Sequence, residues 1–331
     1  MKLLVTGGAG YIGSIVAAQL IDAGHEVSVL DDLSRGHREA IPDQAHHVHC
    51  DLLDAEATRA ALADGCDGVL HFAALALVAE SVAHPERYHR ANFVGSLNLL
   101  DAMRAAGVRR LVFSSTCAVY GEPAEVPMPE TLRTEPVNAY GNSKLAIDRM
   151  ISDECRAHGL GAVSLRYFNV AGSRGALGEH HDPETHLIPL VLQAASGRLA
   201  HATVFGTDYP TPDGTAIRDY IHVEDLGDAH VLGLDRATRP GEHRIYNLGT
   251  GTGFSVRQVI ECARAVTGRA IAVVDEGRRA GDPAVLVASA EKIRSELGWT
   301  PRRSQLETII GDAWAWAQAH PAGYGDAAAP R

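Results

Sequence analysis

Tyr140 and Lys144 lie four residues apart in a segment with a helical pattern at residues 139–158. Residues with this spacing share one face of a helix, with Cβ atoms about 5–6 Å apart. A nearby ammonium group stabilises phenolate over phenol and so lowers the pKa of a tyrosine. A tyrosine with a lowered pKa can take a proton from an alcohol and return it. The pair therefore predicts acid–base chemistry on a carbinol, although exposed helices also carry such a pair by chance.

A glycine-rich turn at residues 7–13, spaced Gly-x-x-Gly-x-x-Gly, predicts a dinucleotide site. Glycines let the backbone turn sharply and approach a pyrophosphate, whose charge lies at the N-terminus of the following helix. Asp31 ends the next apolar run, where a carboxylate hydrogen-bonds the ribose hydroxyls of adenosine and repels a 2′-phosphate. NAD is therefore the predicted cofactor, and Arg35 is the one nearby feature that favours NADP. Asp51 is expected either at the adenine or at a helix N-terminus.

Hydroxyl groups end the apolar run at residues 111–115, and Thr116 follows. Because ligands in open α/β sheets bind at the carboxyl ends of the strands, we expect Thr116 to contact a substrate oxygen beside Tyr140. Cys117 is a candidate reactive thiol, but a small buried hydrophobic residue is the favoured interpretation.

These residues need a set of strands and helices that holds them at one edge of a sheet. Short apolar runs, typical of buried parallel strands, occur at residues 2–6, 26–30, 46–50, 68–72 and 111–115. Helical patterns separate them at residues 14–23, 55–63, 86–106 and 139–158. This alternation predicts an α/β fold with a Rossmann-like, doubly wound parallel sheet covered by helices on both faces.

The alternation breaks after about residue 170. We expect residues 1–170 to form the NAD-binding domain, with a later segment, at about 222–250, returning to it. Residues 171–331 are predicted to form a smaller, mixed α/β substrate domain that begins with a loop at 171–186. Its helices are expected at residues 187–197, 255–267, 289–297 and 304–319.

Composition excludes several classes of protein. The chain has 331 residues, is 46% hydrophobic and carries a formal net charge of −11. Without a basic cluster it is not expected to bind nucleic acid. The five cysteines form no Cys-x-x-Cys pair, which argues against a disulfide framework or a zinc ribbon. Because we find no signal peptide and no apolar run long enough for a bilayer, we expect a cytoplasmic protein without membrane contact.

Two groups of histidines raise the question of a metal site. One group is His180, His181 and His186, with Asp182, and the other is residues 46–49. Both lie in or beside predicted loops, without the fixed geometry of a helix-borne site. Hydrogen-bonded or solvated loop histidines are therefore the favoured interpretation, and no metal is expected.

Seven further segments carry a resemblance to a known family. The segments are TGGAGYIG (6–13), HFAA (71–74), FSST (113–116), YGNSK (140–144), RYFN (166–169), RDYIHV (218–223) and YNLG (246–249). They resemble the extended short-chain dehydrogenase/reductases and, more narrowly, the UDP-glucose 4-epimerase family, from residue 1 to about 325. DYPT (208–211), together with RDYIHV, is specific for the epimerases.

The resemblance implies an isomerase with a retained NAD and a UDP-sugar substrate. Tyr140 would take the proton from the hexose 4-hydroxyl while hydride passes to NAD, and both would return after the keto sugar turns over. Lys144 would lower the pKa of Tyr140 and bind the nicotinamide ribose, and Thr116 would bridge the 4-oxygen. A homodimer formed by the helices at 86–106 and 139–158 is expected from the same resemblance.

The resemblance and the glycine turn together imply two sets of contacts. The cofactor set is Gly7, Gly10, Tyr11, Ile12, Gly13, Asp31, Asp32, Leu33, Ser34, Arg35, Gly36, Asp51, Leu52, Phe72, Ala73, Ala74, Leu75, Ala76, Asn92, Ser114, Tyr140, Lys144 and Phe168. The substrate set is Thr116, Tyr140, Asn169, His186, Leu187, Phe205, Arg218, Tyr220, Arg279 and Asp282. The guanidinium groups of Arg218 and Arg279 suit a pyrophosphate in an acidic protein. The alternative is that each arginine forms a surface salt bridge.

Departures from the family pattern concern the cofactor and the sugar. Ala74 and Ala76 stand where Gly and Lys are frequent, which removes one expected cofactor contact. His186 and Leu286 replace residues near the sugar and leave the substrate open between UDP-glucose/UDP-galactose and UDP-N-acetylglucosamine, UDP-glucuronate or a UDP-pentose.

Two alternative functions agree less well with the sequence. Dehydratases and decarboxylases of the same fold place an acid just after the catalytic hydroxyl residue, where this chain has Cys117 and Ala118. A non-catalytic dinucleotide-binding protein is disfavoured because Tyr140 and Lys144 are both present.

Overall fold

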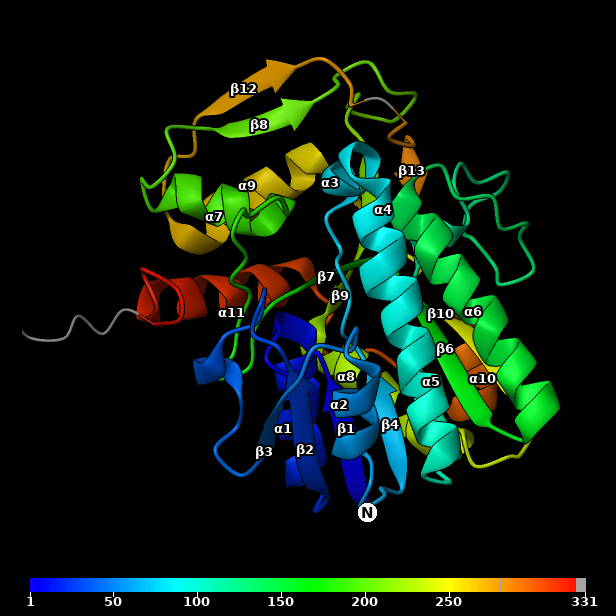
Figure 1. The fold of residues 1–331 in the computed structure, drawn as a ribbon. Coiled ribbons are helices and arrows are strands. Elements are labelled where there is room, and N and C mark those ends of the chain that lie inside the picture. The colour runs from blue at the N-terminus through cyan, green and yellow to red at the C-terminus, as the bar shows by residue number, and fades with distance from the viewer. Residues whose placement is uncertain (280, 326–331) are drawn as a thin grey trace, which may run out of the picture.

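The computed structural model describes residues 1–279 and 281–325, and its centre is a seven-stranded sheet. The strands lie in the order β10-β6-β5-β4-β1-β2-β3, and every neighbouring pair is parallel (Figure 1). Their bounds are β1 Lys2–Thr6, β2 Glu26–Asp31, β3 His46–His49, β4 Gly68–His71, β5 Arg110–Thr116, β6 Gly161–Tyr167 and β10 His243–Leu248. The order reverses beside β1, where ligands of doubly wound sheets bind.

Helices cover both faces of this sheet, which explains why its strands are continuously apolar. On one face, α1 (Tyr11–Asp22) packs on β1 and β2, α8 (Val223–Arg236) packs on β4, β5 and β6, and α10 (Glu291–Leu297) packs on β10. On the other face, α2 (Ala55–Ala61), α5 (Gly95–Ala105) and α6 (Ala139–His158) pack on β4 and β5. The predicted α/β Rossmann-like fold is therefore confirmed.

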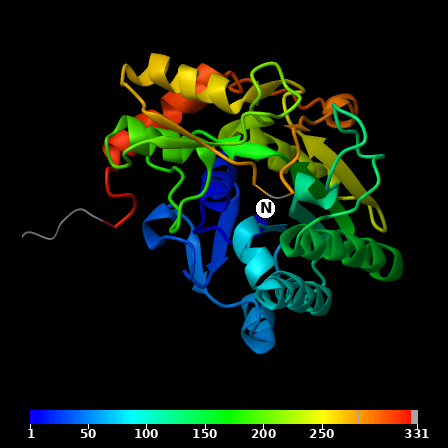
Figure 2. The ribbon, with the colours of Figure 1, turned by 90° about the horizontal axis from the view of Figure 1, so that it is seen from above.

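The remaining elements form a second lobe beyond the carboxyl ends of the strands (Figure 1). Its core joins three helices, α7 (Leu187–Ala195), α9 (Val256–Thr267) and α11 (Leu306–Ala319). One small sheet pairs β8 (Ala202–Phe205) with β12 (Val273–Glu276). In another, β9 (Ile217–His222) pairs with β7 (Asn169–Ala171), β11 (Gly253–Ser255) and β13 (Val285–Leu286). From above, the yellow-to-red C-terminal elements lie opposite the cyan helices (Figure 2).

The chain returns to the first lobe after residue 220. Strand β10 pairs with β6, and α8 and α10 pack on the same sheet. Residues 326–331, which belong to the predicted substrate domain, lie outside the described residues. Within the described residues, no helix combines the length and the apolar character needed to cross a membrane.

The prediction of one helix over residues 86–106 is confirmed, because the backbone stays helical from Pro85 to Ala105. This helix consists of α4 (Pro85–Tyr88), a π-helical segment at His89–Val94 and α5, and the short helix α3 (Val78–Ala83) precedes it. The π-helical segment contains Asn92, whose buried side chain bonds the backbone of Leu75 and the hydroxyl of Ser143. These bonds reach segments far away in the sequence, and π-helical turns frequently lie at functional sites. The other predicted strands and helices differ from the structure mainly at their ends.

Candidate active site

The start of α6 places Tyr140 against the end of β5. Asn138 caps this helix by accepting a hydrogen bond from the Gly141 amide at 2.8 Å. A Cβ atom on Gly141 would lie 2.5 Å from the Ala118 carbonyl oxygen, so only glycine permits this approach. This approach places Tyr140 beside Thr116, whose side chain lowers the pKa of the tyrosine. Two residues predicted to act together therefore do meet.

Burial dominates the electrostatics of Tyr140. Burial raises the pKa of Tyr140 to about 12, and the Thr116 side chain only partly opposes this increase. The expectation that Lys144 lowers this pKa is not met by the side chains present. The Lys144 ammonium instead donates to the Ser114 carbonyl at 2.9 Å and lies 4.8 Å from the centre of the Phe113 ring. It is directed toward β5 rather than toward the phenol.

Lys144 is itself almost fully enclosed, with 2% of its surface exposed. Burial lowers the pKa of Lys144 to about 7, against the opposing charge of Asp148. A lysine with such a pKa exchanges its proton near neutral pH, which is useful in a site that moves protons.

Thr116 lies at the last position of β5 and is 7% exposed. Its hydroxyl oxygen accepts a hydrogen bond from the Ala118 amide at 3.1 Å, which fixes the side chain toward Tyr140. Cys117 is half-buried, and burial raises its pKa to about 12 while the charge of Arg218 acts in the opposite direction. The thiol is therefore unreactive, and Arg218 acts electrostatically on the residue beside Thr116.

A cleft along the carboxyl edge of the first lobe runs from the glycine turn to α3. It contains about 1160 Å³ of empty space, its open mouth included. Many predicted cofactor residues line it: Gly7, Gly10, Asp31, Asp32, Ser34, Arg35, Gly36, Asp51, Leu52, Phe72, Ala73, Ala74, Leu75 and Ala76. The predicted residues that do not line it are Tyr11, Ile12, Gly13, Leu33, Asn92, Ser114, Tyr140, Lys144 and Phe168. The cleft thus corresponds to the adenosine end of the predicted site.

The turn at the base of the cleft fits a dinucleotide. Gly7 has a φ of +70°, and a Cβ atom there would lie 2.5 Å from the Ala73 amide nitrogen. A Cβ atom on Gly13 would overlap the Gly7 carbonyl oxygen. Gly10 lines the cleft directly before α1, whose first amide groups have no partner within the helix. Backbone and helix therefore offer an anion-binding surface, as a pyrophosphate requires.

Asp31 fixes the neighbouring loop. Its carboxylate accepts hydrogen bonds from the amides of Ala9 at 3.0 Å and Leu33 at 2.9 Å. Burial raises the pKa of Asp31, and these two bonds lower it. Leu33 has a φ of +59°, a strained value for this residue type, which the bond to Asp31 helps to hold. Contact between Asp31 and a ribose stays a prediction.

Two predicted cofactor residues serve as supports. Asn92 exchanges two hydrogen bonds with Leu75, at 2.8 and 3.0 Å, and so holds one wall of the cleft. The Tyr11 hydroxyl donates to the Gly172 carbonyl at 2.8 Å and ties α1 to the segment after β7.

The predicted substrate residues gather in two groups on the second lobe. Arg218 bonds Asp282 at 2.5 Å and the Pro283 carbonyl at 2.9 Å. Arg279 lies 3.9 Å from the centre of the Phe205 ring and forms a cation–π contact with it. Asn169 and Tyr220 are register partners in β7 and β9, and Leu187 begins α7.

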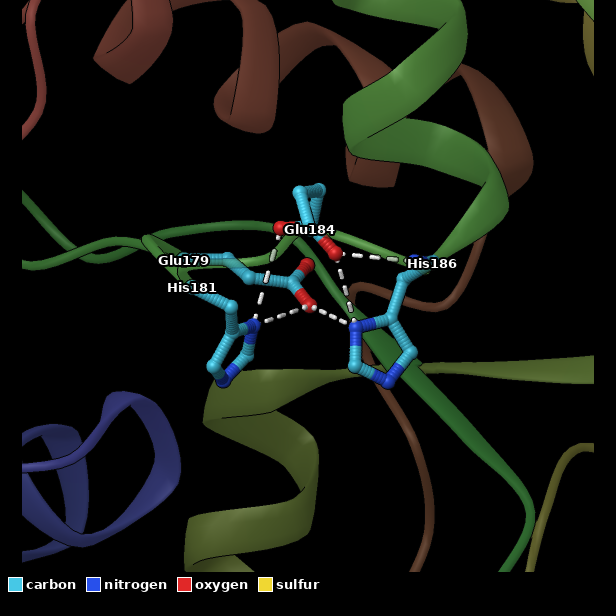
Figure 3. A group of neighbouring side chains, drawn as sticks. All are labelled: Glu179, His181, Glu184 and His186. Atoms are coloured by element: carbon cyan, nitrogen blue, oxygen red, sulfur yellow. Dashed lines mark hydrogen bonds and ion pairs between the residues drawn. The ribbon is translucent and has the colours of Figure 1, made fainter. Parts of the chain in front are cut away.

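Sequence reasoning missed a cluster in the loop between β7 and α7. Glu179, His181, Glu184 and His186 direct their polar atoms to one point (Figure 3). His181 and His186 also line the cleft. The two glutamates were overlooked, although the spacing Glu-x-His-x-x-Glu-x-His is visible in the sequence. The other lining residues that were missed are Leu30, Cys50, Leu77, Glu80, Ala91, Asp182 and Pro183.

Comparison with known proteins agrees with this geometry. Residues 3–249 match the NAD dependent epimerase/dehydratase family. A UDP-glucose 4-epimerase of Streptomyces lividans is 56% identical, over 98% of each chain. One of Corynebacterium glutamicum is 55% identical, over 96% of each chain. The crystal structure of a UDP-glucose 4-epimerase from Brucella ovis in complex with NAD is 44% identical and superposes with a TM-score of 0.92, covering 95% of this chain and 97% of that one.

The family description specifies NAD, the cofactor that the glycine turn and Asp31 predict. The match covers the sheet, the cleft and the residues at the ends of β5 and α6. The chain therefore belongs to the NAD dependent epimerase/dehydratase family.

Proposed function

We propose that this chain interconverts UDP-glucose and UDP-galactose by reversible epimerisation at C4 of the hexose, with tightly bound NAD. The observation that carries the proposal is the approach of the start of α6, with Tyr140, to the end of β5 at Thr116, with buried Lys144 on the same helix. The names of the Streptomyces and Corynebacterium relatives support this substrate. An epimerase needs one residue that both removes and returns a proton, and Tyr140 is in the position to do so.

Bound NAD would supply the hydride acceptor for C4 of the sugar and the hydride donor to the opposite face of the keto sugar. Tyr140 moves the accompanying proton, and Thr116 holds the phenol and the 4-oxygen in line. Because burial raises the pKa of Tyr140 to about 12, the phenolate needs positive charge nearby. Lys144, one helical turn further along, is the residue of this chain that supplies such charge when protonated.

The second lobe holds the nucleotide part of the substrate. Arg218 and Arg279 would bind the pyrophosphate, since guanidinium groups form paired, charge-assisted hydrogen bonds with phosphate. Arg218 is already held by Asp282, and Arg279 by Phe205, which preorganises both groups. Neither Cys117 nor Ala118 is an acid, so the position after Thr116 does not support elimination chemistry.

The test replaces Tyr140 with phenylalanine. Tyr140→Phe is expected to keep its bound NAD and to lower turnover by about 10²–10⁴-fold, the usual contribution of a positioned acid–base group. Turnover is followed by NMR with UDP-glucose, UDP-N-acetylglucosamine and UDP-glucuronate in parallel. Tyr246→Phe is the matched control, because that hydroxyl bonds Glu296 on α10 at 2.7 Å. Parental turnover by Tyr140→Phe, or no conversion of UDP-glucose by the unaltered protein, would refute the proposal.

We also propose a homodimer and a cytoplasmic location. Val94 and Leu97, exposed beside α6, support a contact between two copies of this face. The five cysteines are all unpaired thiols, as expected in a reducing compartment. Sedimentation at micromolar concentration tests the dimer, and a monomer there would remove it.

A further inference from the structure

The loop between β7 and α7 brings four metal-binding side chains together (Figure 3). One ligand atom from each of Glu179, His181, Glu184 and His186 lies within 4.8 Å of all the others. Both histidines direct Nδ1 toward the glutamate oxygens, and the Glu179 carboxylate lies between the two rings (Figure 3). The arrangement is a closed set of two imidazoles and two carboxylates.

The distances match those between the ligands of a small divalent cation. Bonds of about 2.0–2.2 Å in a tetrahedron place neighbouring ligand atoms about 3.3–3.6 Å apart. Nδ1 of His181 lies 3.4 Å from Glu179 and 3.6 Å from Glu184. Nδ1 of His186 lies 2.9 Å from Glu179 and 3.0 Å from Glu184. The distances around His186 are shorter than this spacing, so its ring would move away from both carboxylates to admit a cation.

Charge and hydrogen bonding support the same conclusion. The side chains of Glu179 and Glu184 are each 8% exposed, and buried carboxylates need a positive partner. Among the described residues, no lysine or arginine forms a salt bridge with either glutamate, and the two histidines are their only ion-pair partners. Nδ1 of His181 is buried and has no hydrogen-bond partner in the described chain, although it is aimed into the cluster. His186 is hydrogen-bonded within the cluster, whereas His181 makes only the longer ion pairs at 3.4 and 3.6 Å.

We propose that Glu179, His181, Glu184 and His186 together bind one divalent cation, and that Zn²⁺ fits best. Imidazole nitrogens and carboxylate oxygens in a four-ligand set suit zinc. All four positions come from the protein, so the site is structural rather than catalytic. This assignment departs from the expectation that these histidines are solvated.

The site would hold the loop against the cofactor cleft. Its two histidines line the cleft, as do Asp182 and Pro183 between them. From the opposite wall, Arg35 donates to the Asp182 carbonyl at 2.8 Å. Crosslinking the loop with a metal therefore stabilises the closed wall beside the predicted adenosine position, which couples metal binding to retention of the dinucleotide.

The experiment measures zinc in the purified full-length protein. Chelator-treated protein is titrated with ZnCl₂ against a chromophoric chelator, and metal content is read by mass spectrometry after dialysis. We expect about one zinc per chain and a higher thermal midpoint with ZnCl₂, since binding only the folded state stabilises it. His181→Ala, His186→Ala and Glu179→Gln should each weaken binding by more than about 100-fold, because even outer partners of metal ligands contribute about 10–100-fold.

The controls separate this site from an adventitious one. His49→Ala removes an exposed histidine of the group at residues 46–49 and should leave zinc content and the thermal shift unchanged. Circular dichroism and a parental thermal midpoint without ZnCl₂ show that the variants fold. Zinc lost in His49→Ala, zinc bound equally by all variants, or no zinc bound by the parent would overturn the proposal.

Discussion

Replacing Lys144 with methionine should stabilise the fold while it destroys activity. The ammonium is 2% exposed, and burial lowers its pKa from 10.5 to about 7. At pH 7 and below, this decrease in pKa means that burial of the charged lysine lowers the free energy of unfolding by about 5 kcal/mol. Methionine keeps the apolar stem and removes the charge. It also leaves the Ser114 carbonyl without this donor, at about 1–3 kcal/mol, so the net gain is about 2–4 kcal/mol.

The pH dependence of this gain follows from the direction of the shift. Below pH 7 the lysine is charged in both the folded and the unfolded chain, so the destabilisation is fully present. Between pH 7 and 10.5 the unfolded chain binds a proton that the folded chain has released, so the unaltered protein becomes more stable as the pH rises. The advantage of Lys144→Met should therefore be largest at pH 7 and largely gone near pH 10.

The assay is urea unfolding of NAD-free protein at pH 7, 8.5 and 10, followed by tryptophan fluorescence, together with epimerase turnover. Lys292→Met is the matched control, because Lys292 also donates to a carbonyl, at 2.8 Å, and lies over a tyrosine ring, but in a half-exposed position. Turnover of Lys144→Met should fall by about 100-fold or more. A variant less stable than its parent at pH 7, or a difference that does not shrink by pH 10, would show that burial of this charge is not costly.

Three further substitutions test other parts of the structure. Gly13→Ala should abolish NAD retention because its Cβ atom overlaps the turn, whereas Gly311→Ala, with its nearest neighbour at 3.9 Å, should raise unfolding free energy by about 1 kcal/mol. Burial lowers the pKa of His230 to about 4, so the free energy of unfolding falls as the pH decreases below 6.5. Between pH 7 and 5 this histidine accounts for about 2 kcal/mol of the decrease. Urea unfolding of His230→Leu should therefore show a decrease that is smaller by this amount. Asn92→Leu should lower the free energy of unfolding by about 3 kcal/mol, about 1 kcal/mol for each of its three hydrogen bonds. It should also weaken NAD binding in a fluorescence titration. Unchanged NAD affinity would show that Asn92 does not hold the cleft wall.

The strands of the first lobe could be predicted from sequence because each is apolar without interruption. Parallel strands covered by helices on both faces lose the alternation that would otherwise mark one buried face. The glycine turn was equally predictable, since its close approaches at Gly7 and Gly13 each demand a residue without a side chain. Tyr140 and Thr116 were expected to meet because both follow from the topology of the sheet.

The π-helical turn within the predicted helix at residues 86–106 could not be seen in the same way. Helical periodicity reports which face is apolar, and it says nothing of an Asn92 side chain that bonds Leu75 and Ser143 across the fold. The glutamates at positions 179 and 184 were missed for a related reason. Acidic residues in a polar loop are usually solvated, and only the closed loop shows that two of them are buried beside histidines.

The four-residue spacing on α6 extends one turn beyond Lys144, to Asp148. Tyr140, Lys144 and Asp148 occupy successive turns of one helical face, and Asp148 is 2% exposed. Arg166 donates to the Asp148 carboxylate at 2.9 and 3.1 Å, and Ser115 does so at 3.2 Å. Asp148 is thereby held in place, and its charge raises the pKa of Lys144 against the larger effect of burial. Because the pKa of Lys144 is about 7, only some of the molecules carry a positive charge on this lysine at neutral pH. The charged fraction depends on the Asp148 carboxylate. Asp148 therefore favours the charged form of Lys144, although it does not line the cleft.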